Sequence, residues 1–173
     1  MKPLHLAVVL TALFTLQACV QQPSRLSDDS TFCDKLRGFK TCVAGPIPSH
    51  ETERQAKRFV GRPDALVLYL VRNSLNDRPG LVTVVIDGKK SVGTVPRSLA
   101  RIAIPSGRHE LTLSDQAKEQ TIEVSGNDGE IRIVQIIPNY GFADFGYRLR
   151  LKDDAETRRR AQDSTLIADI ATL

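Results

Sequence analysis

The pattern of hydrophobic and polar positions changes twice along this chain. Residues 6–16 form a short apolar run without a charge, and residues 20–31 are polar and lack a period. From residue 65 onward, many segments alternate between apolar and polar positions. Alternation with a period of two places one set of side chains on each face of a β-strand. The pattern therefore predicts a chain that is mainly β.

Turn residues divide the region after residue 64 into short strands. Asp87-Gly88 is typical of a tight hairpin, because both positions of such a turn need a positive φ. The first strand is a continuous apolar run, which predicts burial on both faces. Short strands at this spacing predict a small antiparallel β-sandwich over residues 64–152. The predicted strands are 65–72, 81–88, 99–105, 108–114, 120–125, 130–138 and 145–152.

Two helices are predicted beside this sandwich. Ser49 is a suitable N-cap for a short helix over residues 50–59. Asp153 followed by Glu156 is typical of a capping box, which predicts a final helix near 153–171 within a terminal segment 153–173. That helix would cover a sheet face or edge and so block unwanted strand pairing. A free amphipathic helix that binds a partner is the alternative.

The first eighteen residues have the organisation of an export signal. Lys2 precedes the apolar run, and this run of eleven residues is too short to cross a bilayer, which takes about 20. Leu16-Gln17-Ala18-Cys19 resembles the lipobox of bacterial lipoproteins. This resemblance implies cleavage before Cys19 and a diacylglycerol on its thiol. A plain secretory signal with an incidental cysteine and a short membrane anchor are the alternatives.

The resemblance to lipoproteins also implies a location and a domain organisation. Val20 rather than Asp follows the lipidated cysteine, which in Gram-negative lipoproteins implies sorting to the outer membrane, here with the domain on the periplasmic face. We therefore expect a signal peptide over 1–18, a lipidated tether over 19–31 and a cysteine loop with a short helix over 32–63. Membrane lipid, held through Cys19, is then one partner of the chain.

Cys33 and Cys42 remain after the lipidated cysteine is set aside. An even pair in an exported chain predicts a disulfide. A structural zinc needs four ligands, and His50 is the only histidine nearby. A reactive thiol is the other possibility, but no helix start and no clear base is placed beside either cysteine.

The composition is that of an ordinary globular domain with a slightly basic surface. Hydrophobic residues make up 41% and charged residues 25%, and the formal net charge is +4. Aromatic residues are only 5% and Trp is absent, which leaves few platforms for stacking sugars or bases. The run Arg158-Arg159-Arg160 is typical of a solvated helix face. Nucleic acid is not an expected partner outside the cytoplasm.

Residues 82–114 carry a further likeness. Asp87-Gly88, a basic turn, Gly93 and the run Pro105-x-Gly107-x-His109 resemble the PEGA-type β-sandwich module. Upstream, Tyr69 and Arg72 have the spacing seen in a PEGA-like family of bacterial lipoproteins whose function is not established. The resemblance implies the sandwich fold and, loosely, a role at the cell envelope. The chain departs from the family where it has Leu99 and Ile131 in place of frequent aromatic residues.

No pattern of catalytic or metal-binding residues is visible in the sequence. Gly-x-Ser-x-Gly, His-Glu-x-x-His and a phosphate loop are all missing. We expect His109 to bond a backbone carbonyl across its turn; a pH-sensitive ligand group is the alternative. We expect Arg72 to anchor the end of its strand by pairing with Asp77 or another turn carboxylate; a binding groove is the alternative. We expect no enzyme, no cofactor and no bound metal.

The segment 138–147 brings aromatic residues and glycines together. Its aromatic residues are Tyr140, Phe142, Phe145 and Tyr147. If it is a loop between strands, these side chains are a candidate binding surface; alternatively, they plug the end of the sandwich. The first hypothesis is a non-catalytic envelope module that binds a protein or glycan partner. An accessory or pilot subunit of a larger envelope complex is the second, and a hydrolase with a dispersed active site is the third.

Overall fold

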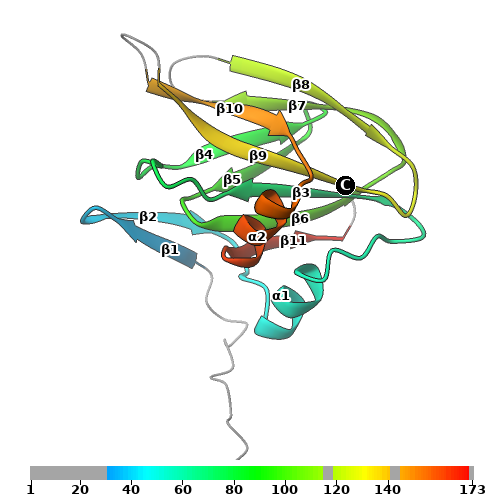
Figure 1. Cartoon of the computed structure of the whole chain (residues 1–173), viewed down its shortest axis with the longest axis horizontal. Helices are drawn as coiled ribbons and strands as arrows, with labels where there is room; N and C mark the ends of the chain where they lie inside the picture. Colours follow the sequence, from blue (N-terminus) through cyan, green and yellow to red (C-terminus); the bar gives the residue numbers. More distant parts are fainter. Residues whose placement is uncertain (1–30, 115–118, 141–144, 172–173) are drawn as a thin grey trace, which may run out of the picture.

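The computed structural model describes residues 31–114, 119–140 and 145–171 (Figure 1). The predicted signal peptide, Cys19 and the tether up to residue 30 lie outside these residues. The described chain is mainly β, with two helices. Its elements are β1 (Thr31–Leu36), β2 (Phe39–Ala44), α1 (His50–Ala56), β3 (Leu66–Arg72), β4 (Val82–Ile86), β5 (Lys90–Thr94), β6 (Ser98–Ile104), β7 (Gly107–Ser114), β8 (Glu119–Gly126), β9 (Ile131–Tyr140), β10 (Phe145–Leu151), α2 (Ala155–Gln162) and β11 (Thr165–Ile170).

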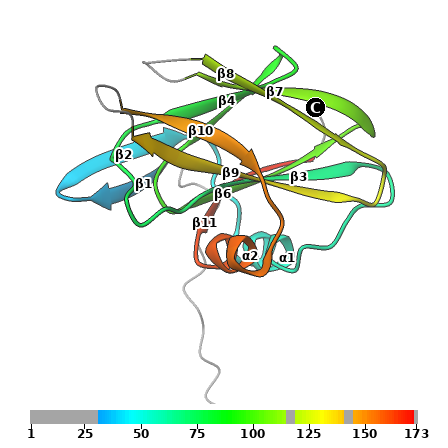
Figure 2. The same cartoon turned by 45° about the horizontal axis from the view of Figure 1, so that its top comes forward.

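Two larger sheets form the sandwich that the sequence predicts (Figure 2). One has the strand order β10-β9-β3-β6-β11, and the other has the order β5-β4-β7-β8. The prediction of purely antiparallel pairing is wrong at two places, because β3 pairs with β9 and β6 pairs with β11 in parallel. Both pairs join strands that are far apart in the sequence, so no turn residues between the two strands predict their pairing.

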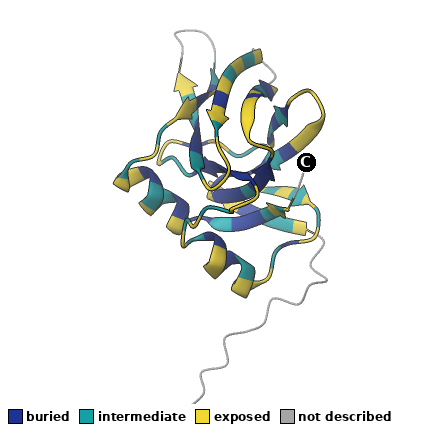
Figure 3. Ribbon diagram, turned by 90° about the vertical axis from the view of Figure 1, so that its right-hand side faces the viewer, coloured by how far each residue is buried: buried dark blue, intermediate teal, exposed yellow. Residues whose placement is uncertain are grey.

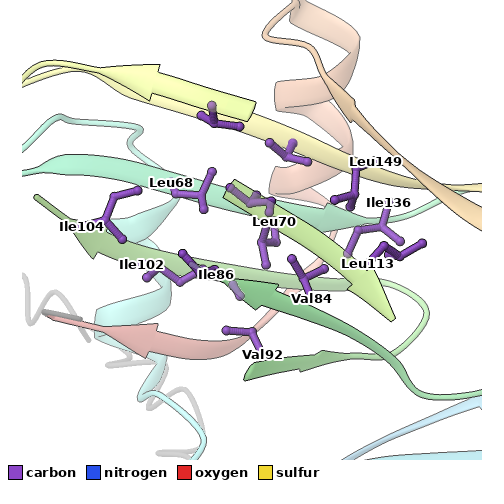
Figure 4. Packing of buried hydrophobic residues seen from close by; sticks show 14 of the residues in the cluster. Leu68, Leu70, Val84, Ile86, Val92, Ile102, Ile104, Leu113, Ile136 and Leu149 are labelled. Carbon is purple, nitrogen blue, oxygen red and sulfur yellow. The ribbon is translucent and has the colours of Figure 1, made fainter. Parts of the chain in front are cut away.

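The main hydrophobic core lies between the two sheets. Figure 4 shows Leu68 and Leu70 of β3 together with Val84 and Ile86 of β4 in this layer. The predicted burial of β3 on both faces is confirmed, since all seven of its residues are buried. Its alternate residues face the other way, toward the helices. This strand is therefore the centre of a three-layered arrangement.

The second face of the five-stranded sheet is covered by both helices (Figure 3). Ala56 of α1 and Ala161 of α2 pack with Val67, Tyr69 and other residues of that face. The Tyr69 hydroxyl donates a hydrogen bond of 2.8 Å to the Ala56 carbonyl. The buried tyrosine thus joins the central strand to the first helix.

Each helix begins at a capping side chain. Ser49 Oγ accepts a hydrogen bond of 3.1 Å from the backbone N–H of Thr52 at the start of α1. Asp154, one residue after the predicted cap, accepts one of 2.8 Å from Thr157 at the start of α2. Such caps satisfy N–H groups that have no partner within the helix.

The predicted C-terminal helix ends much earlier than expected. α2 stops at Gln162, and residues 165–170 form β11 instead. This segment, TLIADI, is rich in residues that favour strands, and the edge of β6 offers it backbone partners along its length apart from an irregularity between Leu166 and Ala168. Parallel pairing with β6 therefore outweighs the apolar spacing that predicted a helix.

The predicted cysteine loop is a β-hairpin. Cys33 of β1 lies opposite Cys42 of β2, and a disulfide joins them with a Cα–Cα distance of 4.0 Å, which confirms the predicted bridge. The Thr41 hydroxyl accepts a hydrogen bond of 3.0 Å from the backbone N–H of Gly80. Arg97 forms an ion pair with the buried carboxylate of Asp34. These contacts attach the hairpin to the sandwich.

Candidate binding surface at the β9–β10 hairpin

Arg72 is a fully buried cation at the end of the central strand β3. Its Nε and Nη2 donate to the two carboxylate oxygens of Asp77 over 3.1 and 3.0 Å. Its Nη1 donates to the carbonyls of Gly80 and Thr94, both over 2.8 Å. A bidentate pair with further carbonyl acceptors is the arrangement that makes a buried guanidinium tolerable. The predicted anchoring of the strand end by Arg72 and Asp77 is thereby confirmed.

Tyr147 completes this buried network from β10. Its hydroxyl accepts a hydrogen bond of 2.7 Å from Arg72 Nη2 and donates one of 2.7 Å to Asp77 Oδ1. Burial raises the pKa of Tyr147 far above its ordinary value, and the neighbouring Asp77 raises it further, whereas the positive charge of Arg72 acts in the opposite direction. Tyr147 therefore lies among the anchoring residues and not on the exposed surface.

The predicted loop 138–147 is the end of a β-hairpin. β9 continues to Tyr140 and β10 begins at Phe145, while Phe142 lies outside the described residues. The rings of Tyr140 and Phe145 lie 5.3 Å apart, and those of Phe145 and Tyr147 lie 5.2 Å apart. These distances suit favourable aromatic pairs. The row of rings leads from the buried network to the surface, where Tyr140 is 52% exposed.

Arg78 is a member of this surface that sequence reasoning missed. Its guanidinium carbon lies 3.9 Å from the centroid of the Phe145 ring and 5.7 Å from that of Tyr140, within the range of cation–π attraction. The Arg78 carbonyl accepts a hydrogen bond of 2.9 Å from Arg72 Nη2. The buried network thus fixes the backbone that carries this exposed cation. Arg78 and Phe145 are too far apart in sequence for a spacing pattern to pair them.

The loop 73–80, which contains Leu75 and Asn76, lies beside the aromatic rings of the β9–β10 hairpin. The Tyr140 hydroxyl donates a hydrogen bond to the Asn76 carbonyl. Leu75, the residue before Asn76, is 92% exposed. Among the described residues, no carboxylate lies within 4.0 Å of the Arg78 guanidinium. We call Leu75, Arg78, Tyr140 and Phe145 the aromatic platform. It combines exposed apolar surface with an exposed cation.

His109, the other candidate from the sequence, is structural. One ring nitrogen lies 2.8 Å from the Pro105 carbonyl and the other 2.7 Å from Asp87 Oδ2. The predicted bond across the turn is therefore confirmed. Burial disfavours the ionised form of Asp87, but the hydrogen bonds from His109 and from the backbone of Glu110 outweigh it and lower the pKa of Asp87. Asp87 and Gly88 have the predicted positive φ, 51° and 66°.

No cluster of three or more potential metal ligands occurs in the part of the chain that the structure describes. Within those same residues, neither helix is long and apolar enough to cross a membrane. Comparison with protein-family models, with curated proteins and with solved structures gives no match.

Proposed function

We propose that this protein is an outer-membrane-anchored periplasmic lipoprotein that acts as a non-catalytic binding module of the cell envelope. The lipobox ending at Cys19 supports the anchor. The disulfide between Cys33 and Cys42 supports an oxidising compartment, where such bonds persist. The resemblance of residues 82–114 to PEGA-type modules supports an envelope role.

The observation that carries the binding role is the aromatic platform. Tyrosine and arginine are enriched at interface centres, and here Arg78 lies near the half-exposed ring of Tyr140, while Leu75 on the same loop as Arg78 is 92% exposed. The network of Arg72, Asp77 and Tyr147 holds the platform in place before any partner arrives. A surface that is already ordered loses less entropy on binding.

The chemistry of the platform favours a protein partner over a glycan. Arg78 offers its donors to a carboxylate, and Leu75 offers apolar contact beside it. Flat aromatic platforms for sugars are scarce in this chain, which lacks Trp. The partner we propose therefore presents an acidic side chain next to an apolar one.

A pull-down from detergent-solubilised envelopes tests this role. The bait is the acylated chain, compared with an Arg78→Ala/Tyr140→Ala variant. The matched control is Arg148→Ala/Leu151→Ala, which removes an arginine and an exposed apolar side chain from the same hairpin but outside the platform. We expect a partner that the wild type and the control retain and the platform variant loses. Equal capture by all three baits would remove the platform from the proposal.

A further inference from the structure

The turn of the β1–β2 hairpin carries three cations and an exposed aromatic ring. Residues 35–40 read KLRGFK, and we call them the hairpin tip. Lys35, Arg37 and Lys40 are exposed, and Phe39 is 66% exposed. Among the described residues, no carboxylate lies within 4.0 Å of these three cationic groups, and no aromatic ring is paired with Phe39. The tip therefore offers positive charge and apolar surface that the domain itself does not use.

The charges of the hairpin tip are placed at a structural cost. Lys35 lies directly opposite Lys40 in the ladder, and like charges in that position repel each other. Arg37 has a φ of 51° and Gly38 one of 85°, as in a tight hairpin turn of type I′. The first position of such a turn favours asparagine, aspartate or glycine, because a positive φ brings Cβ close to the following carbonyl oxygen. An anionic ligand bound at the tip relieves the repulsion between the two lysines.

The hairpin tip projects from the rest of the domain. Figures 1 and 2 show the β1–β2 turn beyond the strands of the two large sheets. Asp34 and Thr41 lie opposite each other and attach the hairpin to the sandwich. Asp34 pairs with Arg97, and Thr41 bonds the backbone N–H of Gly80. Two residue pairs and the turn extend past this attachment, by about 10 Å at ~3.3 Å per residue. The disulfide joins the strands just behind it, so the tip is ordered before any ligand arrives and loses less entropy on binding.

We propose that the hairpin tip docks on the surface of an anionic phospholipid membrane. The ring of Phe39 then lies at the boundary between headgroups and acyl chains, where such apolar side chains bind. Lys35, Arg37 and Lys40 pair with lipid phosphates, and their aliphatic stems lie along the apolar layer. The projection of the tip suits the depth of ~5–10 Å to which interfacial segments are buried.

The size of the tip favours a membrane over an acidic protein. Its six residues are few beside the roughly 20–30 that each partner contributes to a standard protein interface. A membrane contact needs only a few apolar side chains and cations when a second anchor holds the chain nearby. The hairpin tip shares no residue with the aromatic platform.

The proposal rests on the proposed lipid anchor at Cys19. Cys19 precedes Thr31 by twelve residues, which reach about 40 Å when extended. Leu36 lies five residues beyond Thr31, or about 17 Å along β1. The chain before Thr31 is therefore long enough for the tip to reach the membrane that holds the lipid. A lipid chain and a basic patch together attach a protein stably, and two points of contact limit the tilt of the domain.

Tryptophan fluorescence at position 39 tests this contact. The chain has no Trp, so the emission of Phe39→Trp reports that position alone. The full acylated chain is placed in vesicles of phosphatidylcholine, with or without phosphatidylglycerol, and lipids brominated on their acyl chains serve as the quencher. We expect blue-shifted, quenched emission only with phosphatidylglycerol. Three cations near an anionic surface should strengthen docking about a hundredfold, at about fivefold each.

Matched pairs of lysines test the role of charge. Lys35→Gln/Lys40→Gln in the Phe39→Trp chain removes two cations of the tip, and we expect docking to weaken about thirtyfold. Lys89→Gln/Lys90→Gln removes two exposed lysines at the β4–β5 turn and should leave the emission unchanged. All the substituted side chains are exposed, so the urea midpoint of unfolding should be alike in these proteins.

A second tryptophan position separates docking from anchoring. Val60 is also 66% exposed, and Val60→Trp should keep the emission of a water-exposed ring in both kinds of vesicle. Unquenched emission from position 39 with phosphatidylglycerol would overturn the proposal and leave an acidic protein as the ligand of the tip. Equal quenching at positions 39 and 60 would also overturn it. Flotation with vesicles of phosphatidylcholine alone reports the Cys19 anchor, so a failure of the anchor is distinguished from a failure of the tip.

Discussion

Arg72 is the residue on which the loop 73–80 depends. Its guanidinium, which has no exposed surface, bonds Asp77 and two backbone carbonyls of that loop, and it bonds the carbonyl of Thr94 at the end of β5. Arg72→Ala leaves the carboxylate of Asp77 buried without its partner, so we expect the free energy of unfolding to fall by about 3–5 kcal/mol. Chemical denaturation measures this change.

Arg101 is the matched control for that substitution. It also forms a two-bonded pair with a carboxylate, Asp169, but both side chains are about one-fifth exposed. We expect Arg101→Ala to cost about 1 kcal/mol or less. Equal losses for Arg72→Ala and Arg101→Ala would contradict the role we give to the buried network.

Tyr147 makes stability depend on alkaline pH. Burial raises its pKa above the ordinary value of 10.0, so the folded protein keeps the phenolic proton that the unfolded chain loses. The stability contributed by this group is therefore complete below pH 10 and declines as the pH rises through the raised pKa, by at most ~1.4 kcal/mol per unit. We expect Tyr147→Phe to be less stable than the wild type at pH 7, by about 1–2 kcal/mol. The difference should shrink above pH 10 in urea titrations; a gap that is constant with pH would contradict this account.

The sequence predicts contacts between residues only where the partners are close along the chain. Arg72 and Asp77 are five residues apart across a turn, so their pairing is predictable. Arg78 meets Phe145 only because β9 and β10 bring that hairpin beside the loop 73–80. Tyr147 resembles its aromatic neighbours in sequence, and only the folded chain shows that it is buried.

At the scale of elements, seven strands of the sandwich are predicted, whereas β1, β2 and β5 are not, and the last segment is predicted as a helix although it forms β11. The alternation of Tyr147, Leu149 and their polar neighbours identifies β10, because one face of that strand packs on the core. Residues 165–170 have apolar positions that suit either a helix or a strand. The open edge of β6 decides between them, and sequence patterns do not show such an edge.

The disulfide hairpin is an element that its cross-link stabilises. Most residues of β1 and β2 are exposed or half-buried, so packing contributes little to this hairpin. The disulfide closes a loop with a sequence separation of 9. It lowers the entropy of the unfolded chain and so stabilises the folded state by about 2–3 kcal/mol. We expect Cys33→Ser/Cys42→Ser to lower stability by that amount and to speed hydrogen exchange mainly in residues 31–44. Free thiols at both positions in the wild type, measured by mass with and without reduction, would contradict the bridge.

At the scale of the whole molecule, the proposed attachment to a membrane depends on one residue, Cys19. We expect Cys19→Ala to prevent lipidation and to leave an unprocessed or soluble chain, because lipid chains supply the membrane affinity. Fractionation of the envelope measures this, with Cys33→Ser/Cys42→Ser as a control that changes other cysteines. Membrane association that is the same without Cys19 would show that the chain has no lipid anchor at this position.

Site-specific photo-crosslinking in intact cells tests whether a partner binds at the aromatic platform. A photo-reactive amino acid replaces Leu75, which is 92% exposed, and in a second strain it replaces Glu123 on β8, away from the platform. We expect one crosslinked species of defined mass from position 75 that is absent from position 123 and is lost when Arg78→Ala is added. No crosslink at position 75, or the same species from both positions, would contradict the platform as a binding site.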